Sequence, residues 1–272
     1  VLVDTFGDIP YTEALDILKY PQPKYDDANT IYKDLITKLT TASNALNASN
    51  GSYGSADLVF GGDASKWKKF ANTLRLRMAI NLDDIDHAYA SAQALAAVAD
   101  GVITSNTDSA YFTYAASQPN TNPLYVDLVA GGRNDFLPAN TLVDKMNSLI
   151  DPRRSKFFTE YPTAGSGTYK GGIYGELNTY ANFSHLTIKN PVYPGVLFTY
   201  SEVEFLKAEA IERGIAVGGT AESHYNAAIT ASMQDWGVAT VDIATYLLKP
   251  TVAYTTATGT WKQKIGEQSW IA

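Results

Sequence analysis

The stretch from Tyr200 to Val238 constrains the fold of this chain most, because it contains two amphipathic helical patterns separated by glycines. In the first pattern, the apolar residues recur at helical spacing: Val203, Leu206 and Ala210. In the second, one face repeats at i, i+3, i+4, i+7 and i+11: Tyr225, Ala228, Ile229, Ser232 and Trp236. Ser201 and Glu204 have the spacing of a capping box at the start of the first helix. Short helices can bury such stripes only against each other and a neighbour, so the sequence predicts a helical hairpin.

A second helical hairpin is predicted from Trp67 to Gly101. Asp63 can cap its first helix, whose apolar face carries Trp67, Phe70, Ala71, Leu74 and Met78. Its second helix is predicted to bury Ala88, Ala92, Leu95 and Val98. The length of about 34 residues and the Trp-x-x-Phe start are typical of a tetratricopeptide repeat. An earlier helix is predicted from Asp27, with one face made of Ile31, Leu35, Leu39, Ala42 and Leu46, up to a break at residues 47–51.

Residues 102–199, between the hairpins, have a different composition, with many tyrosines among Asn, Ser, Thr and Gly. We predict long loops there and one helix, from about Asn140 to Ile150. Loops carried on a rigid scaffold are where binding residues usually lie. The predicted fold is therefore mainly α, with tetratricopeptide-like helical hairpins and an irregular loop-rich insertion.

The expected organisation is a single domain over residues 1–272. It comprises a helical scaffold at 25–101, the loop-rich insertion at 102–199 as the candidate ligand region, the hairpin at 200–238, and a loop with the start of a helix at 239–272. The chain begins at Val1 without a methionine and stops inside that last helical pattern. We therefore expect both ends to be cut from something longer.

Composition excludes several classes of function. The 272 residues carry a net charge of −7 with 21 basic residues and no run of more than two, so the basic patch of a nucleic-acid-binding protein is missing. The absence of cysteine excludes disulfides, thiolate metal sites and a cysteine nucleophile. No apolar run reaches the roughly 18 residues that a membrane span needs.

The sequence also lacks familiar catalytic and metal motifs. His87, His185 and His224 are scattered, without metal-ligand spacing, and are interpreted as surface or capping residues. Neither Gly-x-Ser-x-Gly nor a phosphate-binding loop occurs. The acidic run from Asp83 to Asp86 lacks the glycine and glutamate of an EF-hand, so a helix-capping turn is favoured over calcium binding. No cofactor, metal site or catalytic residue is predicted.

The charged segment Asp151-Pro152-Arg153-Arg154 admits two interpretations. It could be a charged active-site cluster. The favoured interpretation is structural: Asp151 ends the preceding helix before Pro152 and pairs with an arginine.

Five segments, in order along the chain, carry a family resemblance. Phe6–Ala14 reads FGDIPYTEA and Trp67–Arg77 reads WKKFANTLRLR. The others are Leu137–Asn140 with Asp151–Arg154, Tyr200–Ala210 (YSEVEFLKAEA), and the final residues from Lys264. Together they resemble the motifs of the SusD/RagB-like family over nearly the whole chain.

The resemblance implies a non-catalytic, cell-surface lipoprotein of the bacterial outer membrane. Such a protein binds an oligosaccharide or polysaccharide and helps deliver it to a SusC-like TonB-dependent transporter. Its tetratricopeptide-like helices face the transporter, and loops elsewhere hold the sugar. The resemblance further implies that membrane contact occurs only through a lipid anchor absent from this chain, and that no nucleic acid is bound.

Sugars stack their C–H faces on aromatic rings and present hydroxyls to amides, carboxylates and guanidinium groups. The loop-rich insertion offers these groups, and the candidate ligand-binding residues are Asn120, Asn122, Tyr125, Arg133, Asn134, Asp135, Tyr169 and Tyr174. We expect Tyr125→Ala and Tyr169→Ala to weaken binding without unfolding the protein. The alternative is that these tyrosines pack loops onto the scaffold.

Two other functions stay open. A glycoside hydrolase could use two of the 28 carboxylates as acid and base. A protein-interaction scaffold would use the helical hairpins without any sugar. If a glycan is bound, the sequence is compatible with starch, a host glycan or a plant polysaccharide, and a peptide ligand is compatible too.

Overall fold

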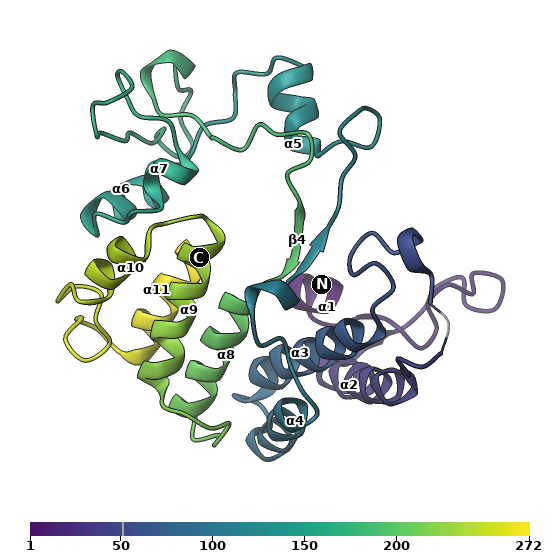
Figure 1. Cartoon of the computed structure of the whole chain (residues 1–272). Helices are drawn as coiled ribbons and strands as arrows, with labels where there is room; N and C mark the ends of the chain where they lie inside the picture. The colour runs from purple at the N-terminus through teal and green to yellow at the C-terminus, as the bar shows by residue number, and fades with distance from the viewer. Residues whose placement is uncertain (51) are drawn as a thin grey trace. The chain divides into compact units, whose positions relative to one another are not determined.

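The computed structural model describes residues 1–50 and 52–272, which form two compact units. Unit 1 comprises residues 1–52, 63–103 and 213–217, and unit 2 comprises residues 53–62, 104–212 and 218–272. Gly51, part of the break predicted at residues 47–51, lies outside the described residues. The chain is mainly helical, as predicted (Figure 1). The predicted domain boundaries stay a prediction.

Unit 1 is built on three helices: α2 (Ala28–Ala45), α3 (Ala64–Leu82) and α4 (His87–Ala99). The Asp27 carboxylate caps α2 through the Thr30 N–H, and Asp63 caps α3 through the N–H groups of Ser65 and Lys66, as predicted for Asp63. Helix α3 packs against both α2 and α4. Within this bundle, the Asn72 amide donates to the carbonyls of Asp100 and Gly101 and fixes the end of α4.

The predicted apolar face of α4 was wrong. The residues it buries are Ala90, Ala94 and Ala97, whereas Ala88, Ala92 and Leu95 are exposed. An alanine-rich helix offers two candidate stripes of nearly equal hydrophobicity. The smaller side chains face α3 because they let the two backbones approach closely.

The acidic turn before α4 has the capping role that was favoured over calcium binding. Asp86 accepts a hydrogen bond from the Tyr89 N–H at the start of α4. Asp83 accepts from Arg213 at 3.1 Å and contacts His87 at 2.7 Å. These carboxylates are therefore occupied by cations and helix N–H groups of unit 1.

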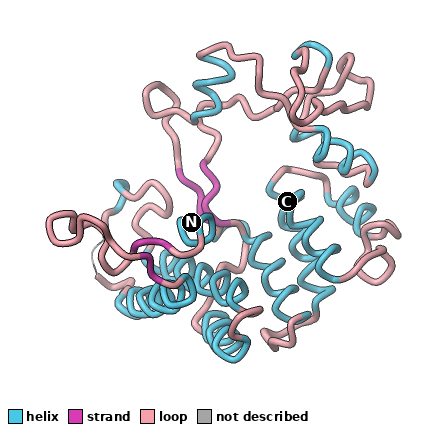
Figure 2. Tube along the Cα trace, turned by 180° about the vertical axis from the view of Figure 1, so that it is seen from behind, coloured by secondary structure: helices cyan, strands magenta, loops and turns pink. Residues whose placement is uncertain are grey.

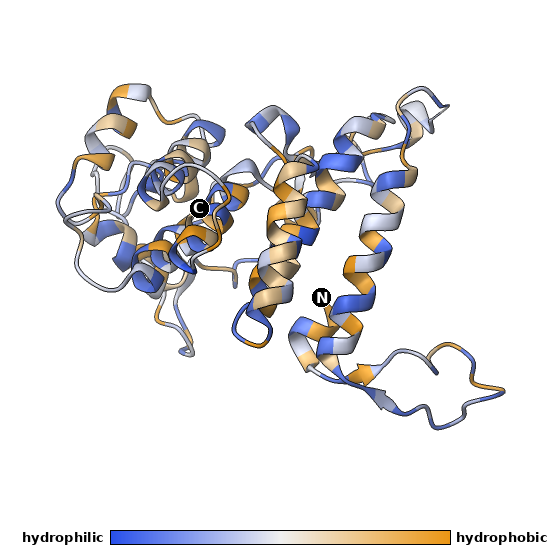
Figure 3. Ribbon diagram, turned by 90° about the horizontal axis from the view of Figure 1, so that it is seen from below, coloured by the Kyte–Doolittle hydropathy of each residue, from blue (hydrophilic) through white to orange (hydrophobic). Residues whose placement is uncertain are grey.

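The first residues of unit 1 form a short helix, α1 (Leu2–Phe6), and then β1 (Ile9–Pro10), which pairs antiparallel with β2 (Tyr25–Asp26). Figure 3 shows the loop between the two strands extending away from the helices of this unit. The Asp26 carboxylate accepts from the Tyr11 and Thr12 N–H groups and closes the base of that loop.

Unit 2 contains the predicted hairpin as α8 (Tyr200–Glu212) and α9 (Ala221–Asp235), and α11 (Trp261–Ile271) packs against both helices. Of the predicted α9 face, Tyr225, Ala228, Ile229 and Ser232 are buried. Trp236 lies beyond the end of α9, half-buried, with its ring 4.4 Å from that of Phe157. A helix missing from the predictions, α10 (Thr240–Leu247), occupies the segment expected to be a loop.

The predicted capping box of α8 was wrong. The Ser201 hydroxyl donates to the Ala228 carbonyl at 2.8 Å, which ties α8 to α9. The Thr199 hydroxyl accepts from the Glu202 N–H instead. The helix starts at Tyr200, two residues earlier than the box requires, so Ser201 and Glu204 face the partner helix.

Glu204 belongs to a charged cluster that joins α8 to α9 in the hairpin. Its carboxylate contacts His224 Nδ1 at 2.6 Å and Lys207 Nζ at 2.9 Å, and His224 Nε2 lies 2.9 Å from the Gly218 carbonyl. Hydrogen bonding to Glu204 raises the pKa of His224, although burial opposes this. Burial would raise the pKa of Glu204, but the bonds from His224 and Lys207 outweigh it and lower that pKa. The interpretation of His224 as a surface or capping residue was therefore wrong.

The loop-rich insertion is closed at its base by an antiparallel pair, β3 (Ala110–Phe112) with β4 (Gly195–Phe198). Most of the chain between these strands is loop (Figure 2). Its helical pieces are α5 (Pro123–Tyr125), the π-helix η3 (Val126–Ala130), α6 (Asn140–Ser148), α7 (Arg154–Phe157) and η4 (Tyr180–Asn182). Helix α6 confirms the helix predicted from about Asn140 to Ile150, whereas the four shorter helical pieces were not predicted.

The structural interpretation of Asp151 is confirmed. Asp151 and Arg153 have 0% exposure, and the Asp151 carboxylate accepts from Arg153 Nε at 3.0 Å and Nη2 at 2.6 Å. Arg153 Nη1 then reaches the Ser232 hydroxyl of α9 at 2.9 Å. The ion pair thus joins the end of α6 to the helical hairpin within unit 2.

Helix α6 ends with an unusual residue. The Ile150 N–H donates to the Asn147 carbonyl and the Asp151 N–H to the Met146 carbonyl, the hydrogen bonds of a Schellman motif. The motif requires a left-handed residue, usually glycine, yet Ile150 occupies it with φ 47°. A β-branched residue is strained in that region. The turn points the Leu149 and Ile150 carbonyls at Lys249 Nζ, at 2.9 and 3.0 Å.

The hairpin should show a pH-dependent stability that depends on His224. Because its pKa is raised in the folded state, its contribution is complete below the unfolded value, about 6.5, and is lost as pH rises through the folded value. A charged hydrogen bond contributes about 1.5–3 kcal/mol. We expect urea unfolding of His224→Gln to show a larger deficit at pH 5.5 than at pH 9. A deficit that does not change with pH would contradict this.

Replacing Ile150 with glycine should stabilise the protein. Relief of the left-handed strain is worth about 1–2 kcal/mol, and the extra freedom of glycine in the unfolded chain offsets about 0.5–1 kcal/mol of it. We expect a net gain of about 0.5–1 kcal/mol in the free energy of unfolding. The matched control is Ile150→Ala, which keeps the strained Cβ and should give no gain. Equal gains in both variants would show that strain is not the cause.

Candidate functional site

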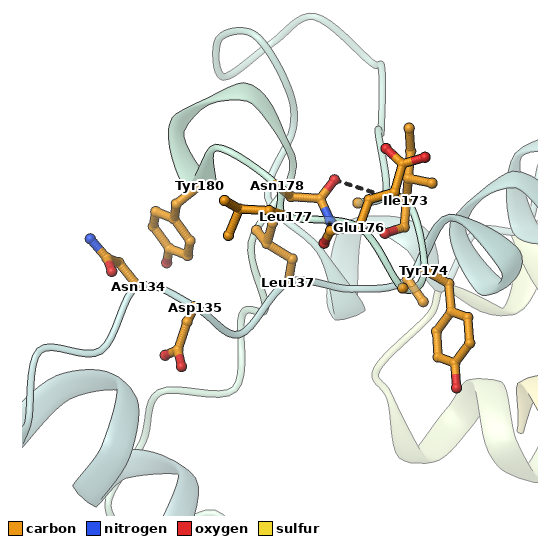
Figure 4. A pocket seen from close by; sticks show the side chains of 12 residues that line it. Asn134, Asp135, Leu137, Ile173, Tyr174, Glu176, Leu177, Asn178 and Tyr180 are labelled. Carbon is orange, nitrogen blue, oxygen red and sulfur yellow. Dashed lines mark hydrogen bonds between the residues drawn. The ribbon is translucent and has the colours of Figure 1, made fainter.

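A pocket in the loop-rich insertion is lined by Tyr174, and we call it the Tyr174 pocket. It has a volume of about 460 Å³ and is lined by residues 134, 135, 137, 139, 172–178 and 180. Figure 4 shows Asn134, Asp135 and Tyr180 on one side and Tyr174 on the other. The volume lies in the range of small-molecule sites.

Two distant segments are joined to make this pocket. The Asn140 N–H donates to the Gly172 carbonyl at 2.7 Å, and the Gly172 N–H donates to the Pro138 carbonyl at 2.9 Å. Gly171 makes this approach possible, because a Cβ there would lie 2.5 Å from the Asn140 Cα. The backbone at the start of α6 therefore supports one wall of the pocket.

The loop that carries Tyr174 is braced by Asn178. The Asn178 amide accepts from the Ile173 N–H and donates to the carbonyls of Ile173 and Glu176, each at 2.9 Å. The Tyr174 N–H is held by the Asn140 side chain at 3.2 Å. The ring itself is 82% exposed. An exposed aromatic ring on a loop fixed by its own hydrogen bonds loses little conformational entropy when a ligand stacks on it.

Polar groups of the pocket come from both segments. Asp135 is held by Arg133 through two bonds, at 2.9 Å from Nε and 2.5 Å from Nη2, and Arg133 also lies over the Phe136 ring. The hydrogen bond from Arg133 lowers the pKa of Asp135, so the carboxylate is ionised at neutral pH. Asn134 and Glu176 are exposed at the rim. These groups can accept or donate hydrogen bonds to sugar hydroxyls.

Tyr180 is the second aromatic residue of the pocket. Its ring stacks on His185, with centroids 3.9 Å apart and 8° between planes, and His185 Nε2 lies 3.1 Å from the Tyr180 carbonyl. Tyr180 is half-buried. This fixes its ring on the side of the pocket opposite Tyr174. No sequence signal separates Tyr180 from the other tyrosines of the insertion.

Three of the predicted ligand-binding residues thus line one pocket: Asn134, Asp135 and Tyr174. Arg133 belongs to the same turn and orients Asp135. The other pocket residues, such as Glu176 and Asn178, were missed because their positions depend on the contact between Gly172 and Asn140. Ligand binding by these residues stays a prediction.

Asn120, Asn122 and Tyr125 are not among the residues that line this pocket. Asn122 is 6% exposed and caps α5, accepting from the Leu124 N–H and donating to the Tyr193 carbonyl. Its amide is therefore engaged within the protein. Asn120 is exposed and Tyr125 is half-buried, and any sugar contact by them stays a prediction.

Tyr169 does not have the exposed ring that the sequence-based expectation required. It is 8% exposed and belongs to the core cluster of unit 2, with the Arg154 guanidinium 5.2 Å from its ring centroid. The glycines around it suggested an exposed loop, but Asn147 holds its carbonyl at 2.8 Å. Tyr169→Ala would open a cavity and destabilise the fold, contrary to the expectation of binding loss alone.

Within residues 1–50 and 52–272, no group of three His, Asp or Glu side chains could hold a metal ion. Across the same residues, no helix is long and apolar enough to cross a membrane.

Comparison with protein families gives a match over residues 1–272 to the SusD-like model, described as starch-binding proteins associating with the outer membrane. This chain belongs to the SusD-like family. The similarity of the structure to solved structures agrees with this family assignment. A chitin-binding protein is 32% identical with a TM-score of 0.81, and the chain covers 99% of its own length and 61% of that structure.

Two further SusD-like structures align over 99% of the chain. A chitin-binding SusD homologue from Flavobacterium johnsoniae is 28% identical with a TM-score of 0.84, and 62% of its chain is covered. A SusD homologue from Bacteroides ovatus is 26% identical with a TM-score of 0.82, and 62% of its chain is covered. The sequence thus spans about three fifths of the SusD-like proteins it matches. Comparison with curated proteins gave no match.

The close approach at Gly171 leads to a testable expectation. A Cβ at Gly171 would overlap the Asn140 Cα and N, which are backbone atoms and cannot rotate away. We expect Gly171→Ala to lower the free energy of unfolding by about 1–3 kcal/mol, a typical cost of overpacking. Chemical denaturation would measure the loss. Gly175→Ala, where a Cβ meets nothing within 4 Å but φ is positive, separates steric overlap from strain. A smaller loss for Gly171→Ala than for Gly175→Ala would contradict the close approach.

Proposed function

We propose that this SusD-like chain is a non-catalytic glycan-binding protein and that the Tyr174 pocket holds the sugar. The observation that carries the proposal is the exposed Tyr174 side chain on a loop braced by Asn178, across the pocket from Asn134 and Asp135. A sugar can stack on the ring while its hydroxyls bond to the amide and the carboxylate. The starch-binding description of the family and the two chitin-binding relatives support a glycan as the ligand class.

The proposed absence of catalysis has a physical argument. Hydrolysis needs one carboxylic acid with a raised pKa to protonate the leaving group. In the pocket, Arg133 holds the pKa of Asp135 below its ordinary value, which is the wrong direction for an acid. The other carboxylate, Glu176, is exposed to solvent. This arrangement suits hydrogen bonding to hydroxyls better than proton transfer.

The wider role that we propose is delivery of oligosaccharides to a SusC-like TonB-dependent transporter by a lipid-anchored, surface-exposed protein. Support comes from the family's association with the outer membrane. The test is co-purification of the intact protein from detergent-solubilised outer membranes with the transporter whose gene neighbours its own. Recovery of the protein in the soluble fraction, without a transporter, would reject this wider role and leave sugar binding untouched.

Replacing Tyr174 with alanine should weaken glycan binding about fivefold, since stacking on one ring is worth on the order of 1 kcal/mol. The fold should be unaffected, because the ring is exposed. Isothermal titration with soluble starch and chitin oligosaccharides measures the change. Tyr53→Ala removes a ring that is 88% exposed outside the pocket and should bind normally. Equal affinity in both variants would remove the site assignment.

Incubating the protein with a panel of glycans separates the three candidate functions: glycan binder, glycoside hydrolase and protein-interaction scaffold. Retention of an intact glycan supports the binder. New reducing ends would indicate a hydrolase. No retention of any glycan would favour a protein-interaction scaffold.

A further inference from the structure

A second pocket of unit 2 is lined by basic side chains, whereas the charged side chains of the Tyr174 pocket are acidic. It has a volume of about 390 Å³ and lies between the end of α6, the start of α7 and helix α10. Two basic side chains line it, Arg154 and Lys249, and we call it the Arg154–Lys249 pocket. Its floor includes the buried rings of Tyr169 and Tyr246. Ser155 and Thr245 supply hydroxyls at an exposed rim.

Both cations are held in place by uncharged oxygens. Arg154 Nε donates to the Asp151 carbonyl and Nη1 to the Asn147 side chain, each at 3.0 Å, and the guanidinium lies over the Tyr169 ring. Lys249 Nζ donates to the carbonyls of Leu149 and Ile150. In the described part of the chain, neither cation forms an ion pair with a carboxylate. Each side chain therefore has N–H donors that these oxygens do not use.

Two carboxylates line the pocket, and neither forms an ion pair with Arg154 or Lys249 in the described part of the chain. A third, Glu160, lies near the Tyr169 hydroxyl and adds to burial in raising the pKa of Tyr169. Asp151 lines the pocket, but its oxygens are engaged by Arg153, which is itself fully buried. Asp242 lies at the rim on the first turn of α10, and among the described residues no hydrogen bond joins its carboxylate to either cation. Asp242 limits the affinity for an anion and leaves the two cations in excess.

Two features of the pocket cost free energy: the burial of Lys249 and the backbone strain at Ile150. Burial lowers the pKa of Lys249; the charge of Asp151 opposes this, and that of Arg154 adds to it. The turn that presents the Leu149 and Ile150 carbonyls to Lys249 is formed by Ile150 in a left-handed conformation, where glycine would be unstrained. Two positive side chains held close together beside a strained residue are typical of ligand sites, because a bound anion offsets the repulsion between them.

We propose that the Arg154–Lys249 pocket binds the carboxylate of an acidic sugar. The planar Arg154 guanidinium can form paired hydrogen bonds to a carboxylate, Lys249 adds a point charge, and the rim hydroxyls meet the sugar hydroxyls. This site is separate from the Tyr174 pocket: the two share no lining residue. The sugar part of the statement rests on the glycan-binding function proposed above.

The first experiment compares oligosaccharides of equal length with and without carboxylates, namely trigalacturonic acid and galactotriose. We expect the acidic trimer to bind about tenfold more tightly, equivalent to one charged hydrogen bond. Arg154→Gln and Lys249→Gln should each remove this difference. Lys189→Gln, which removes an exposed lysine elsewhere in unit 2, should keep it. Equal binding of the two trimers by the unaltered protein would overturn the proposal.

Arg154 and Lys249 also hold the end of α6, so their variants could fail to fold. Ser155→Glu avoids this by placing a carboxylate at the rim while keeping both cations. We expect it to abolish binding of trigalacturonic acid and to raise Tm by about 2 °C relative to the isosteric Ser155→Gln, because the new carboxylate meets an unneutralised pocket. Unchanged binding in Ser155→Glu, or a lower Tm than that of Ser155→Gln, would overturn the proposal.

Two controls test whether the pocket is specific for an acidic sugar and independent of the Tyr174 site. Sodium sulfate that competes with trigalacturonic acid at equal concentration would indicate a site for small anions and overturn the acidic-sugar assignment. Neutral glycan binding that depends on Tyr174, without any preference for the acidic trimer, rejects this inference alone. Preference for the acidic trimer without neutral binding at Tyr174 rejects the Tyr174 site alone.

Discussion

The buried ion pair between Asp151 and Arg153 is the interaction on which the arrangement of unit 2 depends. Both side chains are fully removed from water, and the guanidinium also bonds to Ser232 of α9. Breaking such a pair leaves an uncompensated buried charge and costs about 3–5 kcal/mol, whereas replacing both partners by apolar residues can be neutral. The ion pair therefore determines where α6 lies and adds little to the net stability of the fold. It fixes the end of α6 against the helical hairpin, and the residues on either side of it, Ile150 and Arg154, are placed as a consequence.

Local rules predicted the parts of this structure that depend on neighbours in sequence. Asp151 and Arg153 are two residues apart beside a proline, so a pairing and a helix end could be inferred directly. The Tyr200–Val238 hairpin was predicted for a similar reason, since its glycines and apolar stripes leave few alternatives. The buried face of α4 was not predicted, because seven of its thirteen residues are alanines and make two stripes nearly equivalent. The prediction of the capping box failed because α8 starts two residues earlier than expected. This turns Ser201 and Glu204 toward α9, where Glu204 contacts His224, twenty residues away in sequence.

The candidate site was predictable only in part. Asn134, Asp135 and Tyr174 were chosen for their chemistry, and the structure brings them to one pocket because Gly171 and Gly172 lie against the start of α6. Nothing in the sequence indicates that contact between segments about thirty residues apart, with α6 and α7 between them. Tyr169 and Tyr174 have the same side chain in the same glycine-rich segment, yet one ring is buried under Arg154 and the other is exposed. Exposure in a loop is decided by tertiary contacts, which composition does not contain.

Helix α6 relates the charges of the two pockets. Its N-terminus supports the wall of the Tyr174 pocket, where Asp135 and Glu176 are acidic, and its C-terminal carbonyls hold Lys249 and Arg154. A helix carries about half a positive charge at its N-terminus and half a negative charge at its C-terminus, so both placements are electrostatically favourable. The dipole alone accounts for one cation at the C-terminus at most. Two positive charges against half a negative charge leave an excess even with the Asp242 carboxylate at the rim, and Asp151 cannot cancel it because its own charge is paired with Arg153. A carboxylate from a ligand is the group that would complete this end of the helix.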